Sequence, residues 1–100
     1  MSLFQLKYRF NARPWKYSGK SGWWFISLPK DMSKEIRAGF KDLEEGWGRL
    51  STTAIIGGYE WKTAIWYDTK QETYFLPLKA EVRKKLGKGI ETELEVEIRL

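Results

Sequence analysis

The chain has 100 residues, of which 42% are hydrophobic and 31% charged, a composition typical of one folded domain with a single core. It contains no cysteine and no histidine, which excludes disulfides, thiol or imidazole catalysis, and zinc sites built from those residues. The formal net charge of +5 is ordinary for a small domain. The main anomaly is an aromatic content of 16%, with six tryptophans.

Residues 1–100 are therefore expected to form a single domain, and residues 1–3 are compatible with a cloning remnant. No apolar run is long enough to span a bilayer, and no secretory signal pattern opens the chain. These observations predict a cytoplasmic protein with no membrane partner.

The charges are unevenly distributed along the chain. Residues 1–30 hold six basic and no acidic residues, whereas residues 91–97 hold four glutamates and no basic residue. One interpretation is a basic surface for a nucleic acid or another polyanion. The other is that the two segments neutralise each other in the fold.

The first predicted element is a strand over residues 4–10. Leu6, Tyr8 and Phe10 share one face, while Lys7 and Arg9 share the other, and this period of two is typical of a half-buried strand. Residues 13–17, Arg-Pro-Trp-Lys-Tyr, are interpreted as a loop in which aromatic and basic residues interleave.

Residues 23–28 form the second predicted strand, which ends at Pro29. A short helix follows, with Asp31 or Ser33 as its N-cap and apolar residues four apart as far as Phe40. Gly46 and Gly48 then predict a loop around Trp47.

The second half of the chain predicts a hairpin and two further strands. Gly57-Gly58 is a two-residue hairpin signal between strands 50–56 and 59–67. Residues 68–72 predict a turn, and residues 73–78 the next strand.

A short helix is predicted over residues 80–86, with Gly87 as its C-cap, and the last strand over residues 90–100. In that strand Leu94, Val96 and Ile98 alternate with glutamates. Because the first and last strands carry opposite charges, we expect them to pair. The glutamates are then a solvated strand face and not a metal site.

The segments 25–30 and 74–79 form a weak internal repeat, since each leads from a strand through a proline toward a short helix. The predicted fold class is therefore all-β: about six strands and two short helices, closed as a small barrel with a pseudo-two-fold within one chain.

Three motifs together resemble the bacterial DUF1905 family, a domain of unknown function: Trp-Gly-Arg at 47–49, Ile-Gly-Gly-Tyr-Glu-Trp-Lys-Thr at 56–63, and Tyr-Phe-Leu-Pro-Leu-Lys at 74–79 with the helix that follows. The resemblance implies a double-split β-barrel, an architecture also used by DNA-binding proteins of the AbrB and MazE types. The chain departs from the family at Gly89-Ile90, where members often have Gly-Asp. The family carries no established activity to transfer.

No enzyme motif is present, and no catalytic residue, cofactor or metal site is predicted. On the strand 59–67, Trp61 shares a face with Thr63 and Ile65, which predicts the interior, whereas Trp66 faces outward. The candidate ligand site lies at the barrel mouth and consists of Trp47, Trp61, Lys62 and Arg83. The alternative polyanion site consists of Arg13, Trp15, Lys16 and Lys20.

The functional hypothesis is a non-enzymatic binding module for an unidentified small ligand or protein partner, acting as a monomer or weak dimer. The alternative is nucleic-acid binding of low sequence specificity through the basic N-terminal half. A third hypothesis, an enzyme, requires an apolar cleft with a perturbed lysine or carboxylate.

Overall fold

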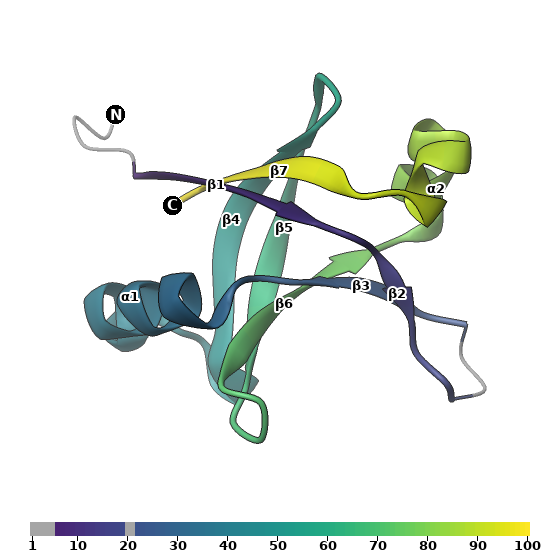
Figure 1. Ribbon diagram of the computed structural model, residues 1–100. Coiled ribbons are helices and arrows are strands. Elements are labelled where there is room, and N and C mark those ends of the chain that lie inside the picture. Colours follow the sequence, from purple (N-terminus) through teal and green to yellow (C-terminus); the bar gives the residue numbers. More distant parts are fainter. Residues whose placement is uncertain (1–5, 20–21) are drawn as a thin grey trace.

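The computed structural model describes residues 6–19 and 22–100. In this part of the chain, seven strands form one antiparallel sheet in the order β1-β7-β4-β5-β6-β3-β2 (Figure 1). The strands are β1 (Lys7–Ala12), β2 (Trp15–Lys16), β3 (Trp24–Ser27), β4 (Arg49–Ile56), β5 (Tyr59–Asp68), β6 (Thr73–Leu78) and β7 (Leu94–Arg99). The helices are α1 (Lys30–Phe40) and α2 (Ala80–Leu86), with the short 3-10 helices η1 (Lys41–Leu43), η2 (Gly46–Gly48) and η3 (Gly87–Glu91).

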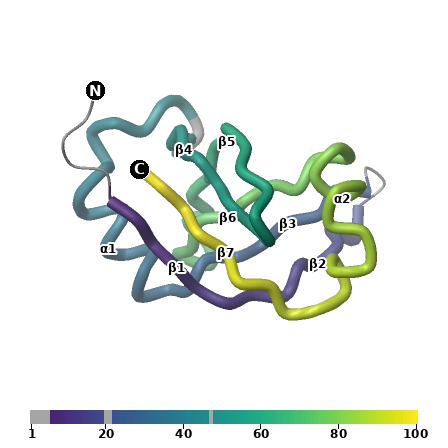
Figure 2. The backbone as a smooth tube through the Cα atoms, turned by 90° about the horizontal axis from the view of Figure 1, so that it is seen from above, coloured from purple at the N-terminus to yellow at the C-terminus, as the bar shows by residue number. Residues whose placement is uncertain are grey.

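The two ends of the strand order, β1 and β2, are separated in the chain by Arg13 and Pro14 alone. The sheet must therefore curl until its two edges approach each other, as the backbone trace also shows (Figure 2). Proline lacks the amide that a ladder requires, which accounts for the break between β1 and β2. The interpretation of residues 13–17 as a loop is wrong for Trp15 and Lys16, and these two residues add one strand to the six expected.

The first and last strands pair as predicted. Phe10 lies opposite Val96 on the inner face, and Arg9 lies opposite Glu97 on the outer face. The last strand begins later than expected, at Leu94, because residues 87–91 continue from α2 as the 3-10 helix η3. The expectation of a fully solvated acidic face is wrong at Glu97, which is buried between two arginines.

The β4–β5 hairpin turns at Gly57 and Gly58, whose φ angles of 56° and 83° are the left-handed values of a type I′ turn. The observed bounds of β6 and α2 are those predicted from the sequence. Gly87 ends α2 with a φ of 56°, as a C-terminal glycine is expected to do.

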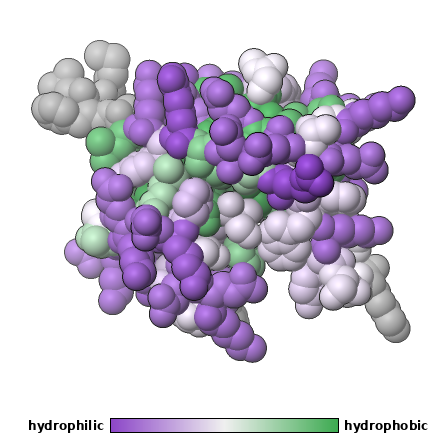
Figure 3. All heavy atoms as spheres, in the orientation of Figure 1, coloured by the Kyte–Doolittle hydropathy of each residue, from purple (hydrophilic) through white to green (hydrophobic). Residues whose placement is uncertain are grey.

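The core fills the inner face of the curled sheet. Alternate residues on β4 and β5, such as Leu50 and Ile65, point inward and are fully or almost fully buried. The other buried core residues are Phe10, Ile26, Leu28, Ile36, Ala54, Ile56, Tyr74, Leu76, Leu78, Val82, Val96 and Ile98. Figure 3 shows the viewed face covered mostly by hydrophilic side chains, with hydrophobic atoms visible in patches between them.

The helices lie at opposite ends of the sheet (Figures 1 and 2). The predicted N-cap of α1 is wrong, since Pro29 precedes the helix and no side chain caps it. Ser33 instead faces the sheet, where its Oγ accepts the backbone N–H of Tyr74 at 3.1 Å. The Ser33 hydroxyl therefore links α1 to β6 and does not cap the N-terminus of the helix.

The strands of the weak repeat, β3 and β6, are antiparallel neighbours, and each leads into a helix. A double-split barrel with an internal two-fold stays a prediction of the family resemblance. Among the residues described, none of the helices has the length and apolar character needed to cross a membrane.

Candidate ligand-binding groove

A groove of about 1310 Å³ lies on the outer face of the curled sheet. On β5, Ala64 and Trp66 line this groove, while Ile65 between them belongs to the core. Because side chains of a strand alternate between faces, the groove and the core share β4, β5 and β6 without sharing most of their side chains. Tyr17 and Trp23, from the connection between β2 and β3, add to the lining.

Strand pairing arranges the lining side chains in rows that cross the strands. Arg99 of β7 lies opposite Thr53 of β4, and Thr53 lies opposite Lys62 of β5. We call these three residues the cationic row, because Arg99 and Lys62 carry positive charge on either side of the uncharged Thr53. Lys79, directly after β6, and Lys16 of β2 line the same groove.

An aromatic patch occupies the other part of the groove. Trp66 lies opposite Phe75, and Trp15 lies opposite Phe25. The ring centroids of Trp15 are 5.1 Å from Phe25 and 5.3 Å from Phe75, and the rings of Trp23 and Phe25 stack with an interplanar angle of 12°. The aromatic patch is defined as Trp15, Trp23, Phe25, Trp66 and Phe75.

The aromatic patch is held rigidly at its centre and is accessible at its margins. Trp15 donates its Nε1–H to Ser27 Oγ at 2.9 Å, so its ring is fixed by a hydrogen bond as well as by packing. Trp23 and Trp66 are 47% and 38% exposed. These margins offer ring faces to a ligand.

Small side chains separate the cationic row from the aromatic patch. Ser51 of β4 lies opposite Ala64 of β5, and both line the groove. Ala64 lies between Lys62 and Trp66 along β5. The Cα atoms of Lys62 and Trp66 are about 13 Å apart at the usual rise of a strand. The small side chains leave the hollow into which the longer ones extend.

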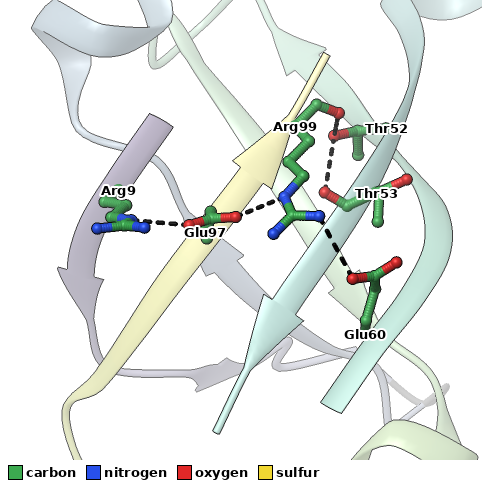
Figure 4. A network of polar contacts seen from close by, with 6 residues as sticks. All are labelled: Arg9, Thr52, Thr53, Glu60, Glu97 and Arg99. Carbon is green, nitrogen blue, oxygen red and sulfur yellow. Dashed lines mark hydrogen bonds and ion pairs between the residues drawn. The ribbon is translucent and has the colours of Figure 1, made fainter. Parts of the chain in front are cut away.

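A chain of ion pairs includes Arg99, at one end of the cationic row (Figure 4). Glu97 accepts hydrogen bonds from Arg9 Nε at 2.7 Å and from Arg99 Nε at 2.6 Å, and Arg99 also lies 3.4 Å from Glu60. The hydrogen bonds from the two guanidiniums hold the pKa of Glu97 below its ordinary value, and the same pairing raises the pKa of Arg9. Thr52 fixes the end of β7 by donating to the Arg99 carbonyl at 2.8 Å.

The cationic side chains of the groove differ in how far they are neutralised. Arg99 is shared by two carboxylates, and Arg49 lies 3.1 Å from Glu45. Within residues 6–19 and 22–100, no carboxylate lies within ion-pair distance of Lys16, Lys62 or Lys79. Positive charge therefore remains available at three lysines.

The structure separates three of the four residues of the first predicted site, namely Trp61, Lys62 and Arg83. Lys62 lines the groove, whereas Trp61 faces inward on the same strand and stacks on Tyr59 at 5.4 Å. Arg83 lies half-buried in α2, away from the groove lining, with no hydrogen-bond partner for its Nε among the described residues. The side chain of Trp47 lies outside the described part of the structure.

The second predicted site is partly brought together. Trp15 and Lys16 both line the groove, while Arg13 is exposed between β1 and β2. Lys20 lies outside the described residues. The groove thus takes one residue from the first site and two from the second.

Several groove residues were missed by the sequence analysis, including Arg49, Arg99 and Phe75. Each occupies an outward position on its strand, so alternation alone could have identified the face. Their meeting in one groove depends on the strand order, which local patterns do not contain.

A second polar cluster lies under α1, away from the groove. The buried Tyr74 hydroxyl donates to the carboxylate of Glu44, which also lies 3.2 Å from Arg37. Burial, followed by the bond to Glu44, raises the pKa of Tyr74. The Arg37 guanidinium lies 3.8 Å from the centroid of the Tyr67 ring. This cluster fastens α1 and its extension to β5 and β6.

In the described ranges, no group of three or more acidic side chains could hold a metal ion. The family model of DUF1905, a domain of unknown function, matches residues 10–98, and the chain therefore belongs to this family. No curated protein matches the sequence significantly.

Proposed function

We propose that this domain is a non-catalytic binding module whose groove holds an anionic ligand with a planar ring. The observation that supports this function is the arrangement of Lys62 and Trp66 on either side of the small Ala64 on one strand face. Lysine attracts anionic groups, and an exposed indole offers a face for stacking. Binding sites of this kind combine apolar walls with a few polar groups.

The groove gives little support to acid–base catalysis. Asp68 is the one carboxylate side chain among the described groove-lining residues, and it accepts the backbone N–H of Lys70 at 3.1 Å. Asp68 stabilises a turn, and among the described groove-lining residues no second carboxylate side chain accompanies it to form a paired acid and base. The absence of histidine and cysteine from the chain points in the same direction.

Polyanion binding by the N-terminal segment on its own has weaker support. Arg9 lies against Glu97, so part of the basic charge of β1 is neutralised within the sheet. Trp15 and Lys16 contribute to the groove, where they act together with residues of β5 and β6.

Titration with adenosine 5′-monophosphate tests the proposal, because this probe joins a planar adenine ring to a phosphate that carries one to two negative charges. We expect tryptophan fluorescence to change saturably and amide NMR shifts to concentrate near Lys62, Ala64 and Phe75. Adenosine, which has the ring without the phosphate, should bind more weakly. Lys62→Gln should weaken binding of the nucleotide, while the control Lys84→Gln on α2 should not. Shifts outside the groove, or equal effects of both variants, would contradict the proposal.

A further inference from the structure

We infer that the occupant of the groove is single-stranded nucleic acid, with its phosphates on the lysine side and its bases on the aromatic patch. The inference rests on the proposed function and names its ligand class. It depends on three properties of the groove: the number of stacking faces, the placement of unpaired charge, and the room for more than one planar group.

The aromatic patch has more rings than one small ligand needs. Six aromatic side chains line the same groove, namely the five of the aromatic patch and Tyr17 from the β2–β3 connection. Its volume of about 1310 Å³ exceeds the usual upper limit of roughly 1,000 Å³ for a small-molecule pocket. A chain of several planar units matches this extended set of rings better than one nucleotide does.

Most of the available charge lies beside the rings, while Lys16 adjoins Trp15 of the aromatic patch. Lys62 and Lys79 line the groove without ion-pair partners among the described residues, and Arg99 continues the row across β4. Arg99 is shared by Glu97 and Glu60, Arg49 by Glu45, and Asp68 adds a negative charge, so we assign the phosphate contacts to the lysines. A backbone along the lysines leaves its bases directed toward Trp66 and Phe75.

This arrangement favours a single strand over a duplex and tolerates different sequences. Bases within a duplex are already stacked on each other, whereas unpaired bases can stack on aromatic side chains. Among the described residues, no helix contributes side chains to the groove lining that could read base edges in a major groove. Stacking and charge together therefore predict weak sequence preference.

Fluorescence anisotropy of labelled oligothymidylate tests the inference with the full chain. We expect a strand of about twelve nucleotides to bind at least tenfold more tightly than thymidine 5′-monophosphate, and more tightly than a duplex of equal length. With three lysine contacts, affinity should fall roughly 20-fold between about 50 and 200 mM salt. A peptide of glutamates with the same charge should bind more weakly, since it lacks rings.

The variants locate the contact. Lys62→Gln with Lys79→Gln should lower the slope of log affinity against log salt by about 1.4, whereas the control pair Lys84→Gln with Lys88→Gln should leave it unchanged. Trp66→Ala should weaken strand binding about fivefold or more, with folding checked by circular dichroism. The lysine variants decide the matter if Trp66→Ala unfolds.

The two proposals can fail separately. If the mononucleotide binds in the groove but the strand binds no more tightly, the proposed function stands and this inference is overturned. Preference for the duplex, or for the glutamate peptide, also overturns it. If neither the mononucleotide nor the strand binds, both proposals are wrong.

Discussion

Arg9 and Glu97 form an ion pair of 2.7 Å between the first and last strands of the sheet, 88 positions apart in the chain. The same carboxylate binds Arg99 at 2.6 Å, so one buried glutamate holds an arginine on either side. The pair joins β1 to β7 and, through Arg99, places a guanidinium at the edge of the groove. The Glu97 carboxylate thus connects the pairing of the first and last strands to the arginine at the edge of the candidate site.

Glu97→Gln should destabilise the protein at about pH 7, because both arginines lose their common carboxylate. The pKa of Glu97 is lowered by folding, so its stabilising effect is present above its ordinary pKa of 4.5. That effect is lost as the pH falls through the lower pKa of the folded state. Urea unfolding of the wild type and the variant should therefore differ most near neutral pH and converge in acid.

Glu95→Gln is the matched control for this prediction. Glu95 lies two residues away on the same face of β7, opposite Asn11, and is exposed. We expect it to change the free energy of unfolding by less than about 0.5 kcal/mol. An equal loss in both variants would show that the ion pairs of Glu97 do not stabilise the sheet.

Tyr74→Phe should cost roughly 1.5–3 kcal/mol of unfolding free energy at neutral pH, since a hydrogen bond to the Glu44 carboxylate is lost. Folding raises the pKa of Tyr74 above 10.0, so its stabilising effect is present below that pH. The effect declines as the pH rises above about 10 toward the higher pKa of the folded state. Urea unfolding at neutral and alkaline pH should show this decline in the wild type and a smaller one in Tyr74→Phe.

Tyr17→Phe provides the comparison, because Tyr17 is 50% exposed. This variant should match the wild type in stability at neutral pH and keep the alkaline decline. Ultraviolet titration would give a direct check, since the difference between the wild type and Tyr74→Phe should show that the pKa of Tyr74 is raised above 10.0. A pKa of Tyr74 at its ordinary value of 10.0 would contradict the role of its burial and of its bond to Glu44.

Replacement of Gly48 and of Gly39 by alanine should change the free energy of unfolding in opposite directions. Gly48 has a φ of +72°, and a Cβ there would lie 3.1 Å from Tyr67 Cβ. We expect Gly48→Ala to cost at least about 1–3 kcal/mol of unfolding free energy, from backbone strain and crowding. Gly39 lies within α1, and a Cβ added there would meet open space. Gly39→Ala should therefore raise the free energy of unfolding by roughly 0.5–1 kcal/mol. Thermal and urea unfolding would measure both, and destabilisation by Gly39→Ala would contradict the argument.

Local patterns predicted the strands well where one signal dominated. Two left-handed glycines set the turn of the β4–β5 hairpin, and the alternation in residues 94–99 set the faces of β7. Opposite charges at Arg9 and Glu97 were enough to predict that the first and last strands pair. These features depend on neighbours in sequence or on one pair of complementary faces.

The errors arose where tertiary contacts override a local preference. Ser33 is a good N-cap residue, but in the fold its hydroxyl binds the Tyr74 amide. Trp61 and Lys62 are adjacent in sequence and point to opposite faces, so a site containing both required a strand without alternation. The groove joins β2 to β4, β5, β6 and β7, and that neighbourhood depends on the curl of the whole sheet.

Removing one carboxylate should strengthen anion binding in the groove. Glu60 lies 3.4 Å from Arg99 and is exposed, so Glu60→Gln frees part of the guanidinium charge with little effect on stability. Exposed ion pairs contribute up to about 1 kcal/mol, which corresponds to at most roughly a fivefold gain in affinity for a phosphate-bearing probe. Glu91→Gln, at an exposed position of η3, changes the net charge equally, and Glu91 lies outside the groove. If both variants gain equally, overall charge and not Arg99 governs binding, and if Glu60→Gln gains nothing, Arg99 takes no part in the site.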